Sequence, residues 1–91
     1  MLKNTSLAFI GSGTMAEAMI KGILNNGLTD PHRIIASGPR PERGRELEER
    51  YGVRGTTENQ EAAQAGDIVV LSIKPQVLPV VLDELRGLIH P

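Results

Sequence analysis

Short runs rich in apolar and β-branched residues alternate along this chain with segments in which apolar residues recur every three or four positions. The runs cover residues 7–10, 33–37, 53–56 and 67–73, and the helix-spaced segments start near residues 14, 41, 57 and 78. Such runs are typical of strands, and the recurring spacing is typical of one face of a helix. Strands that alternate with helices predict an α/β fold, here a Rossmann-like, doubly wound parallel sheet of about four strands in the order 3-2-1-4.

Local signals set the expected ends of several elements. Pro41 and Gly52 are expected to begin and end the second helix. Thr57 and Gln60 have the spacing of a capping box, so Thr57 is expected to cap the third helix. The run at residues 67–73 is the most apolar of the four, and we expect it to be buried between layers of helices.

The first strand leads directly into a glycine turn. Gly11, Gly13 and Ala16 fill the pattern G-x-G-x-x-G/A that opens a dinucleotide-binding βαβ unit. Gly11 can adopt the angles of a tight turn, Gly13 lets the backbone approach a pyrophosphate, and Ala16 keeps the helix close to the strand. The free N–H groups of the first helical turn, from about Thr14 onward, then point at the phosphates. The alternative is a purely structural glycine turn, but the strand before it and the helix after it favour nucleotide binding.

The end of the second strand favours NADP over NAD. In an NAD-binding unit, a carboxylate about 20 residues beyond the glycines accepts hydrogen bonds from the adenosine ribose. That position falls at residues 36–38, which are not acidic, and the first carboxylate, Glu42, lies in the next helix. A hydroxyl from Ser37 and guanidinium groups from Arg40 and Arg43 suit a 2′-phosphate. The alternative for the two arginines is an ordinary solvated start of a helix.

Composition argues against several other functions. The chain has 91 residues, a formal net charge of −1, one Tyr, one Phe and no Cys. We therefore expect no nucleic-acid partner, because there is neither a basic excess nor a stacking platform, and no metal site. No apolar run approaches the roughly 20 residues of a membrane span, and no signal peptide is present, so we expect a cytoplasmic protein that does not bind membranes.

Four stretches together carry a resemblance to a known family. They are residues 9–16 (FIGSGTMA), residues 36–39 (ASGP), residues 51–53 (YGV) with Asn59 after them, and residues 70–76 (VLSIKPQ). The chain resembles pyrroline-5-carboxylate reductase in these stretches, and the resemblance extends over its whole length. The glycine motif is shared by many dehydrogenases, whereas its combination with Lys74-Pro75-Gln76 at this distance is much more specific. Ser72 departs from the family, in which an alanine is usual.

The resemblance implies hydride transfer from NAD(P)H to the C=N carbon of 1-pyrroline-5-carboxylate, which gives proline. It implies that the pyrophosphate is held by Ile10, Gly11, Ser12, Gly13, Thr14 and Met15. Ser37 and Gly38 would face the adenosine ribose or its phosphate, and Asn59 would approach the adenosine half. The nicotinamide side would be lined by Ser72, Ile73, Lys74 and Pro75. Lys74 is the only candidate for a catalytic residue. We expect it instead to have a structural role in which its backbone matters, so no catalytic residue is assigned.

Family members also contain a further strand-bearing segment and a helical C-terminal domain that forms the dimer and binds the substrate. We therefore expect residues 1–91 to be the NAD(P)-binding domain of a homo-oligomeric enzyme, with NADP as cofactor and NAD as the alternative. Other possible functions are those of a related NADP-binding oxidoreductase, of the F420-dependent or 3-hydroxyacid dehydrogenase type, or of a non-catalytic nucleotide-binding module. Without a fifth strand, the fourth strand has an unpaired edge, which predicts self-association.

Overall fold

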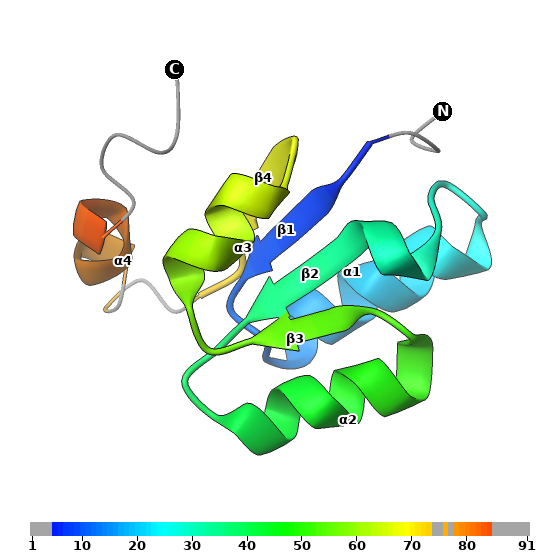
Figure 1. Ribbon diagram of the computed structural model, residues 1–91, viewed down its shortest axis with the longest axis horizontal. Coiled ribbons are helices and arrows are strands. Elements are labelled where there is room, and N and C mark those ends of the chain that lie inside the picture. Colours follow the sequence, from blue (N-terminus) through cyan, green and yellow to red (C-terminus); the bar gives the residue numbers. More distant parts are fainter. Residues whose placement is uncertain (1–4, 74–75, 77, 85–91) are drawn as a thin grey trace.

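A computed structural model of the chain describes residues 5–73, Gln76 and residues 78–84. The elements, in chain order, are β1 (Leu7–Ile10), α1 (Thr14–Asn25), a 3₁₀ helix (Pro31–Arg33), β2 (Ile34–Ser37), α2 (Pro41–Tyr51), β3 (Arg54–Thr56), α3 (Asn59–Ala65), β4 (Ile68–Leu71) and α4 (Leu78–Glu84). The four strands form one parallel sheet in the order β3-β2-β1-β4 (Figure 1). The predicted fold class and strand order are confirmed.

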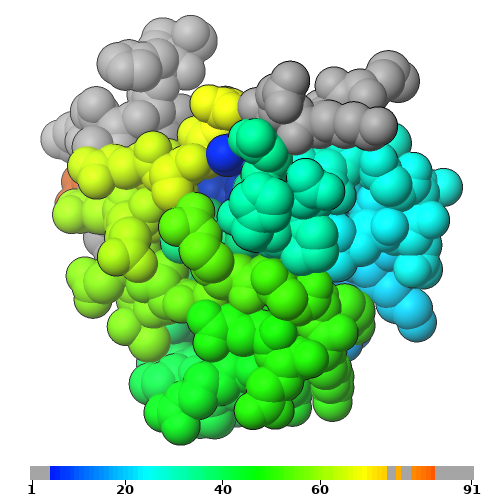
Figure 2. Space-filling model, turned by 45° about the vertical axis from the view of Figure 1, so that its right-hand side comes forward, coloured from blue at the N-terminus to red at the C-terminus, as the bar shows by residue number. Residues whose placement is uncertain are grey.

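The sheet separates two apolar layers. Leu7 and Phe9 of β1 face α1 and α2, where they pack with Ile20 and Leu47 among others. The alternate residues of β1, Ala8 and Ile10, face α3 and α4 and pack with Ala62, Ala63 and Val81, as the period-2 geometry of a strand requires. Only small patches of blue, the colour of the residues around β1, are visible in the space-filling view (Figure 2). All four residues of β1 are buried, with helices packed on both faces of the sheet.

The helix ends follow the sequence signals in part. Gly52 ends α2 with a left-handed conformation, φ 77°, which glycine adopts without steric cost. The expectation that Thr57 caps α3 is wrong, because the helix begins at Asn59 and Glu58 occupies the N-cap position. The Thr56 hydroxyl instead accepts a hydrogen bond from the Glu58 N–H over 3.1 Å. This two-residue turn places the helix start one position later than the capping box predicts.

Three of the predicted strands are shorter than expected. Arg33 belongs to the 3₁₀ helix, and Val53 precedes β3 although its side chain is buried in the core. β4 comprises only Ile68–Leu71, and its predicted burial is wrong, since Ile68 is 42% and Leu71 38% exposed. In the described part of the chain β4 pairs only with β1, so it forms the edge of the sheet.

None of the helices in the described part of the chain is long and apolar enough to cross a membrane. Within the same residues, no group of three or more His, Asp or Glu side chains is placed to hold a metal ion.

Candidate functional site

The parallel strands bring most of the predicted site residues to one edge of the sheet. Ile10, the last residue of β1, lies in register with Ser37 of β2 and Leu71 of β4. The segments that follow these three strands therefore begin side by side at the carboxyl end of the sheet (Figure 1). In open α/β sheets this is the place where ligands bind.

Gly11 is required by both conformation and packing. Its φ is +109°, a value that residues with a side chain rarely adopt. A Cβ at this position would clash with the carbonyl oxygen of Ser72 and lie 2.7 Å from Cγ2 of Ile73. The Gly11 N–H donates a hydrogen bond to the Ser37 carbonyl oxygen over 2.8 Å. The turn is thus held between the ends of β2 and β4.

Gly13, unlike Gly11, is required neither by its backbone conformation nor by the packing around it. It occupies the N-cap position of α1 with φ −82°, which other residues adopt without strain, and a Cβ there would meet nothing within 4 Å. Gly13, Thr14 and Met15 are all exposed, with Met15 at 66%. Gly13 provides no side-chain cap for the amides of the first turn. The helix N-terminus therefore offers N–H groups beside open space, which suits an anion.

The end of β2 packs closely against the glycine turn. A Cβ on Gly38 would clash with the Ser12 hydroxyl and lie 3.1 Å from the Ser12 Cβ. Ser37 is fully buried, and its hydroxyl donates a hydrogen bond to Oδ1 of Asn59 over 2.7 Å. The structure therefore brings Ser12, Ser37, Gly38 and Asn59 together, from three separate segments of the chain.

The segment after β4 lies against the same turn. The Ser72 hydroxyl lies within hydrogen-bond distance of the carbonyl oxygens of Ile10 (3.2 Å) and Gly11 (3.1 Å), to which it donates. The Ser72 hydroxyl thus contacts the backbone of the turn. Ile73 packs on the apolar layer beneath α3. Lys74 and Pro75 lie outside the residues that the structure describes.

The two arginines after β2 occupy different environments. Arg40 is exposed at the start of α2, beside a shallow pocket of about 180 Å³ that Arg43, Glu42 and Glu46 also line. The side chain of Arg43 is only 15% exposed and forms ion pairs with Glu17 and Glu46. The alternative of an ordinary solvated helix start is therefore wrong for Arg43. Arg40 is the better placed of the two to meet a phosphate from solvent.

Glu17, in the first turn of α1, is held by three donors from α2. Its carboxylate accepts hydrogen bonds from the Tyr51 hydroxyl (2.6 Å), from Arg43 (2.6 Å) and from Arg50 (3.1 Å). The bond from Tyr51, followed by that from Arg43, lowers the pKa of the Glu17 carboxyl from 4.5 to about 2. The same carboxylate raises the pKa of Arg43 and that of Tyr51. The contact between Glu17 and Tyr51 was not predicted from the sequence, because the spacing of residues does not show which faces of α1 and α2 pack together.

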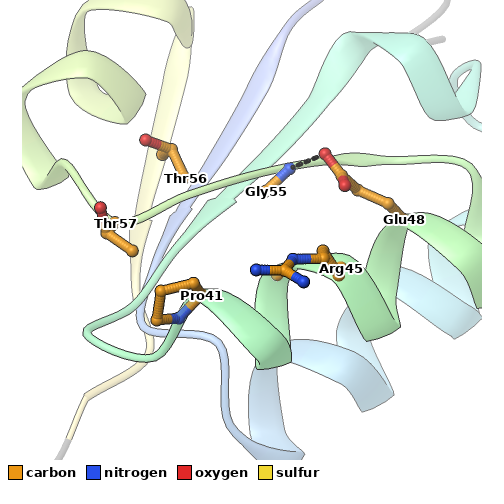
Figure 3. A pocket seen from close by; sticks show the side chains of 7 residues that line it. Pro41, Arg45, Glu48, Gly55, Thr56 and Thr57 are labelled. Carbon is orange, nitrogen blue, oxygen red and sulfur yellow. Dashed lines mark hydrogen bonds between the residues drawn. The ribbon is translucent and has the colours of Figure 1, made fainter.

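A second pocket lies at the outer edge of the sheet, between α2 and β3 (Figure 3). It has a volume of about 320 Å³ and is lined by Pro41, Gly44, Arg45, Glu48, Gly55, Thr56 and Thr57. The Glu48 carboxylate accepts a hydrogen bond from the Gly55 N–H over 3.1 Å, which occupies a backbone donor of this edge strand. None of the predicted nucleotide-binding residues lines this pocket.

Comparison with known proteins agrees with this arrangement. The family model described as NADP oxidoreductase coenzyme F420-dependent matches residues 6–90. The chain belongs to this family. A pyrroline-5-carboxylate reductase from Corynebacterium melassecola is 37% identical to this family member over 83 residues, which are 91% of this chain and 30% of that protein.

Two solved structures show the same fold. The structure of a pyrroline-5-carboxylate reductase from Coxiella burnetii is 34% identical, with a TM-score of 0.84 over 90% of this chain and 30% of that one. A Plasmodium falciparum pyrroline carboxylate reductase, crystallised with NADP bound, is 26% identical, with a TM-score of 0.79 over 94% of this chain and 30% of that one. This NADP oxidoreductase family member therefore spans about 30% of the length of the relatives that it matches.

Proposed function

We propose that this chain is the NADP-binding domain of a pyrroline-5-carboxylate reductase. The observation that carries the proposal is the N-terminus of α1, where Gly13 leaves open space on its Cβ side while Gly11 is packed against the end of β4. One glycine is fixed by its surroundings and the other leaves room for a ligand. This division of roles is what a dinucleotide-binding turn requires.

The residues present fit the cofactor. The pyrophosphate would lie against residues 10–15, whose exposed helix N-terminus provides N–H donors and the positive end of a helix dipole. The adenosine half would lie near Gly38 and Asn59, with Arg40 paired to the 2′-phosphate, and the nicotinamide would lie toward Ser72 and Ile73. When bound, NADPH supplies the hydride that reduces the C=N carbon of 1-pyrroline-5-carboxylate to give proline. This chain binds and orients the cofactor for that step.

We assign the substrate contacts to the part of the related reductases that this chain does not match. The chain spans 30% of the Corynebacterium melassecola reductase, and none of its residues is assigned as a proton donor to the substrate. The complete enzyme would be a cytoplasmic homo-oligomer, as the resemblance in residues 9–16 and 70–76 implies.

Calorimetric titration of the purified chain with NADPH and NADH, together with an assay of pyrroline-5-carboxylate reduction, tests the proposal. We expect NADPH to bind more tightly than NADH and the isolated chain to show no turnover. Failure of both cofactors to bind would refute a nucleotide-binding role.

A second candidate is reduction that depends on coenzyme F420, because the family model that matches residues 6–90 carries that description. The full-length protein distinguishes the two reactions. Reduction of pyrroline-5-carboxylate by NADPH supports the first, whereas electron exchange between NADP and coenzyme F420 without activity on pyrroline-5-carboxylate supports the second.

A further inference from the structure

Arg43 reaches from α2 to the backbone of the glycine turn. Its Nε donates a hydrogen bond to the Ser12 carbonyl oxygen over 2.5 Å, and its Nη2 donates to the Gly13 carbonyl oxygen over 3.4 Å. These are the two carbonyl groups directly before the first helical residue, Thr14. The guanidinium therefore touches the turn on the side that faces α2.

The guanidinium is itself held in place. Its Nη2 also donates to the Glu17 carboxylate over 2.6 Å, and Nη1 is paired with Glu46. Tyr51 donates to the second oxygen of Glu17 over 2.6 Å. Because the five N–H donors of a guanidinium lie in a rigid plane, contacts on three sides fix its orientation.

The contacts with Ser12 and Gly13 determine where the neighbouring amides point. In a trans peptide the C=O and the following N–H point in opposite directions. A Ser12 carbonyl directed at Arg43 therefore turns the Gly13 N–H away from α2. The Gly13 carbonyl also accepts a hydrogen bond from the Glu17 N–H over 3.0 Å, so Arg43 and the helix together direct the Thr14 N–H. The Gly13 and Thr14 N–H groups both lie at the N-terminus of α1.

We propose that Arg43 is a positioning residue that orients the Gly13 and Thr14 amides toward the pyrophosphate of the cofactor. This inference rests on the proposed function of the turn. It also separates the two arginines: Arg40 meets the 2′-phosphate, whereas Arg43 acts through the backbone of the turn. Arg43 therefore supports NADPH and NADH binding equally.

The test compares Arg43→Met with Arg45→Met, a matched change at an exposed arginine of the same helix that lines the separate pocket beside β3. Loss of hydrogen bonds from a charged group predicts that R43M weakens NADPH and NADH by the same factor, about 10- to 100-fold. R45M should change neither. Arg43→Lys should not restore binding, because an ammonium lacks the planar fork. A loss confined to NADPH, or full rescue by lysine, would overturn the proposal.

A measurement without cofactor separates this inference from the proposed function. The NMR order parameters of the Gly13 and Thr14 amides, which report how firmly the two N–H vectors are held, should be lower in R43M than in R45M. Unchanged order parameters contradict the positioning role, even in a chain that binds neither cofactor. Failure of the wild-type chain to bind either cofactor refutes the proposed function instead.

Tyr51→Phe keeps the test decisive if R43M does not fold. It removes one donor to Glu17 while leaving Arg43 in place, so it should loosen the guanidinium without removing it. We expect a smaller but again equal weakening of NADPH and NADH, with a lower order parameter at the Gly13 amide. Affinities and order parameters identical to those of the wild type would count against the proposal.

Discussion

The Ser37 hydroxyl donates a hydrogen bond to Oδ1 of Asn59 over 2.7 Å, which ties the end of β2 to the first turn of α3. Ser37 is fully buried. The family resemblance implies that both residues lie near the adenosine half of a cofactor, and the structure shows that they contact each other. Their arrangement is therefore set by the fold as well as by any ligand.

Ser37→Ala should lower the free energy of unfolding by about 1 kcal/mol, the usual net value of a hydrogen bond. Urea denaturation of S37A, Asn59→Ala and the double variant measures the pair directly. We expect a coupling energy of about 0.5–1.5 kcal/mol. Strictly additive losses would show that the contact contributes nothing to stability.

Gly11→Ala should destabilise the chain and abolish cofactor binding. The positive φ costs about 1–3 kcal/mol for a residue with a side chain, and the methyl group would also clash with the Ser72 carbonyl oxygen. Gly22→Ala is the matched control, because Gly22 lies within α1 and a Cβ there meets nothing within 4 Å. G22A should raise stability by about 0.5–1 kcal/mol. Thermal melts and NADPH titration of both variants check this contrast, and equal behaviour would contradict it.

The strand order and the glycine turn could be predicted from the sequence because their signals are local. Apolar runs, helix spacing and the G-x-G-x-x-A pattern each lie within about ten residues, and right-handed connections between parallel strands then leave few possible topologies. The left-handed end of α2 at Gly52 is local in the same sense.

The contacts of Arg43 could not be predicted in this way. Glu17 is 26 residues from Arg43 along the chain, and Ser12 is 31 residues away. Whether an arginine early in a helix faces solvent or the neighbouring helix depends on how the two helices pack, which the charge pattern alone does not determine. The exposure of β4 was missed for a related reason. An apolar run is typical of a strand that is covered on both faces, but its composition does not show whether neighbouring elements cover it in the structure.

Arg40→Ala tests the preference for NADP. Loss of a charge-assisted contact of about 1.5–3 kcal/mol with the 2′-phosphate should weaken NADPH roughly 10- to 100-fold. NADH lacks that phosphate, so its affinity should barely change. Calorimetric titration of R40A and of the Arg45→Ala control measures both. Equal losses for the two cofactors would contradict the assignment of Arg40 to the 2′-phosphate.

The Glu17 carboxylate predicts a dependence of stability on acid pH. Its pKa is about 2 in the folded chain and near 4.5 without its partners, so it binds protons more weakly when folded. Its contribution to stability is therefore complete above pH 4.5 and is lost as the pH falls toward 2. Glu17→Gln should melt below the wild type at pH 7, and the difference should narrow below pH 4.5. Melts of E17Q and of the exposed control Glu49→Gln across this range check it, and a constant difference for E17Q would contradict it.

The exposed edge of β4 predicts that the isolated chain self-associates. β4 contains four apolar residues, IVVL, and in the described part of the chain its outer edge has no strand partner. An apolar groove of about 440 Å³ adjoins it, lined by Ile68 and Val70 together with residues of β1 and α1. Ile68→Lys should suppress association, because a charge on an edge strand opposes strand pairing. Val80→Lys, at a 61% exposed position on α4, should not. Sedimentation at increasing concentration distinguishes the variants, and a wild-type chain that stays monomeric throughout would show that this edge does not pair.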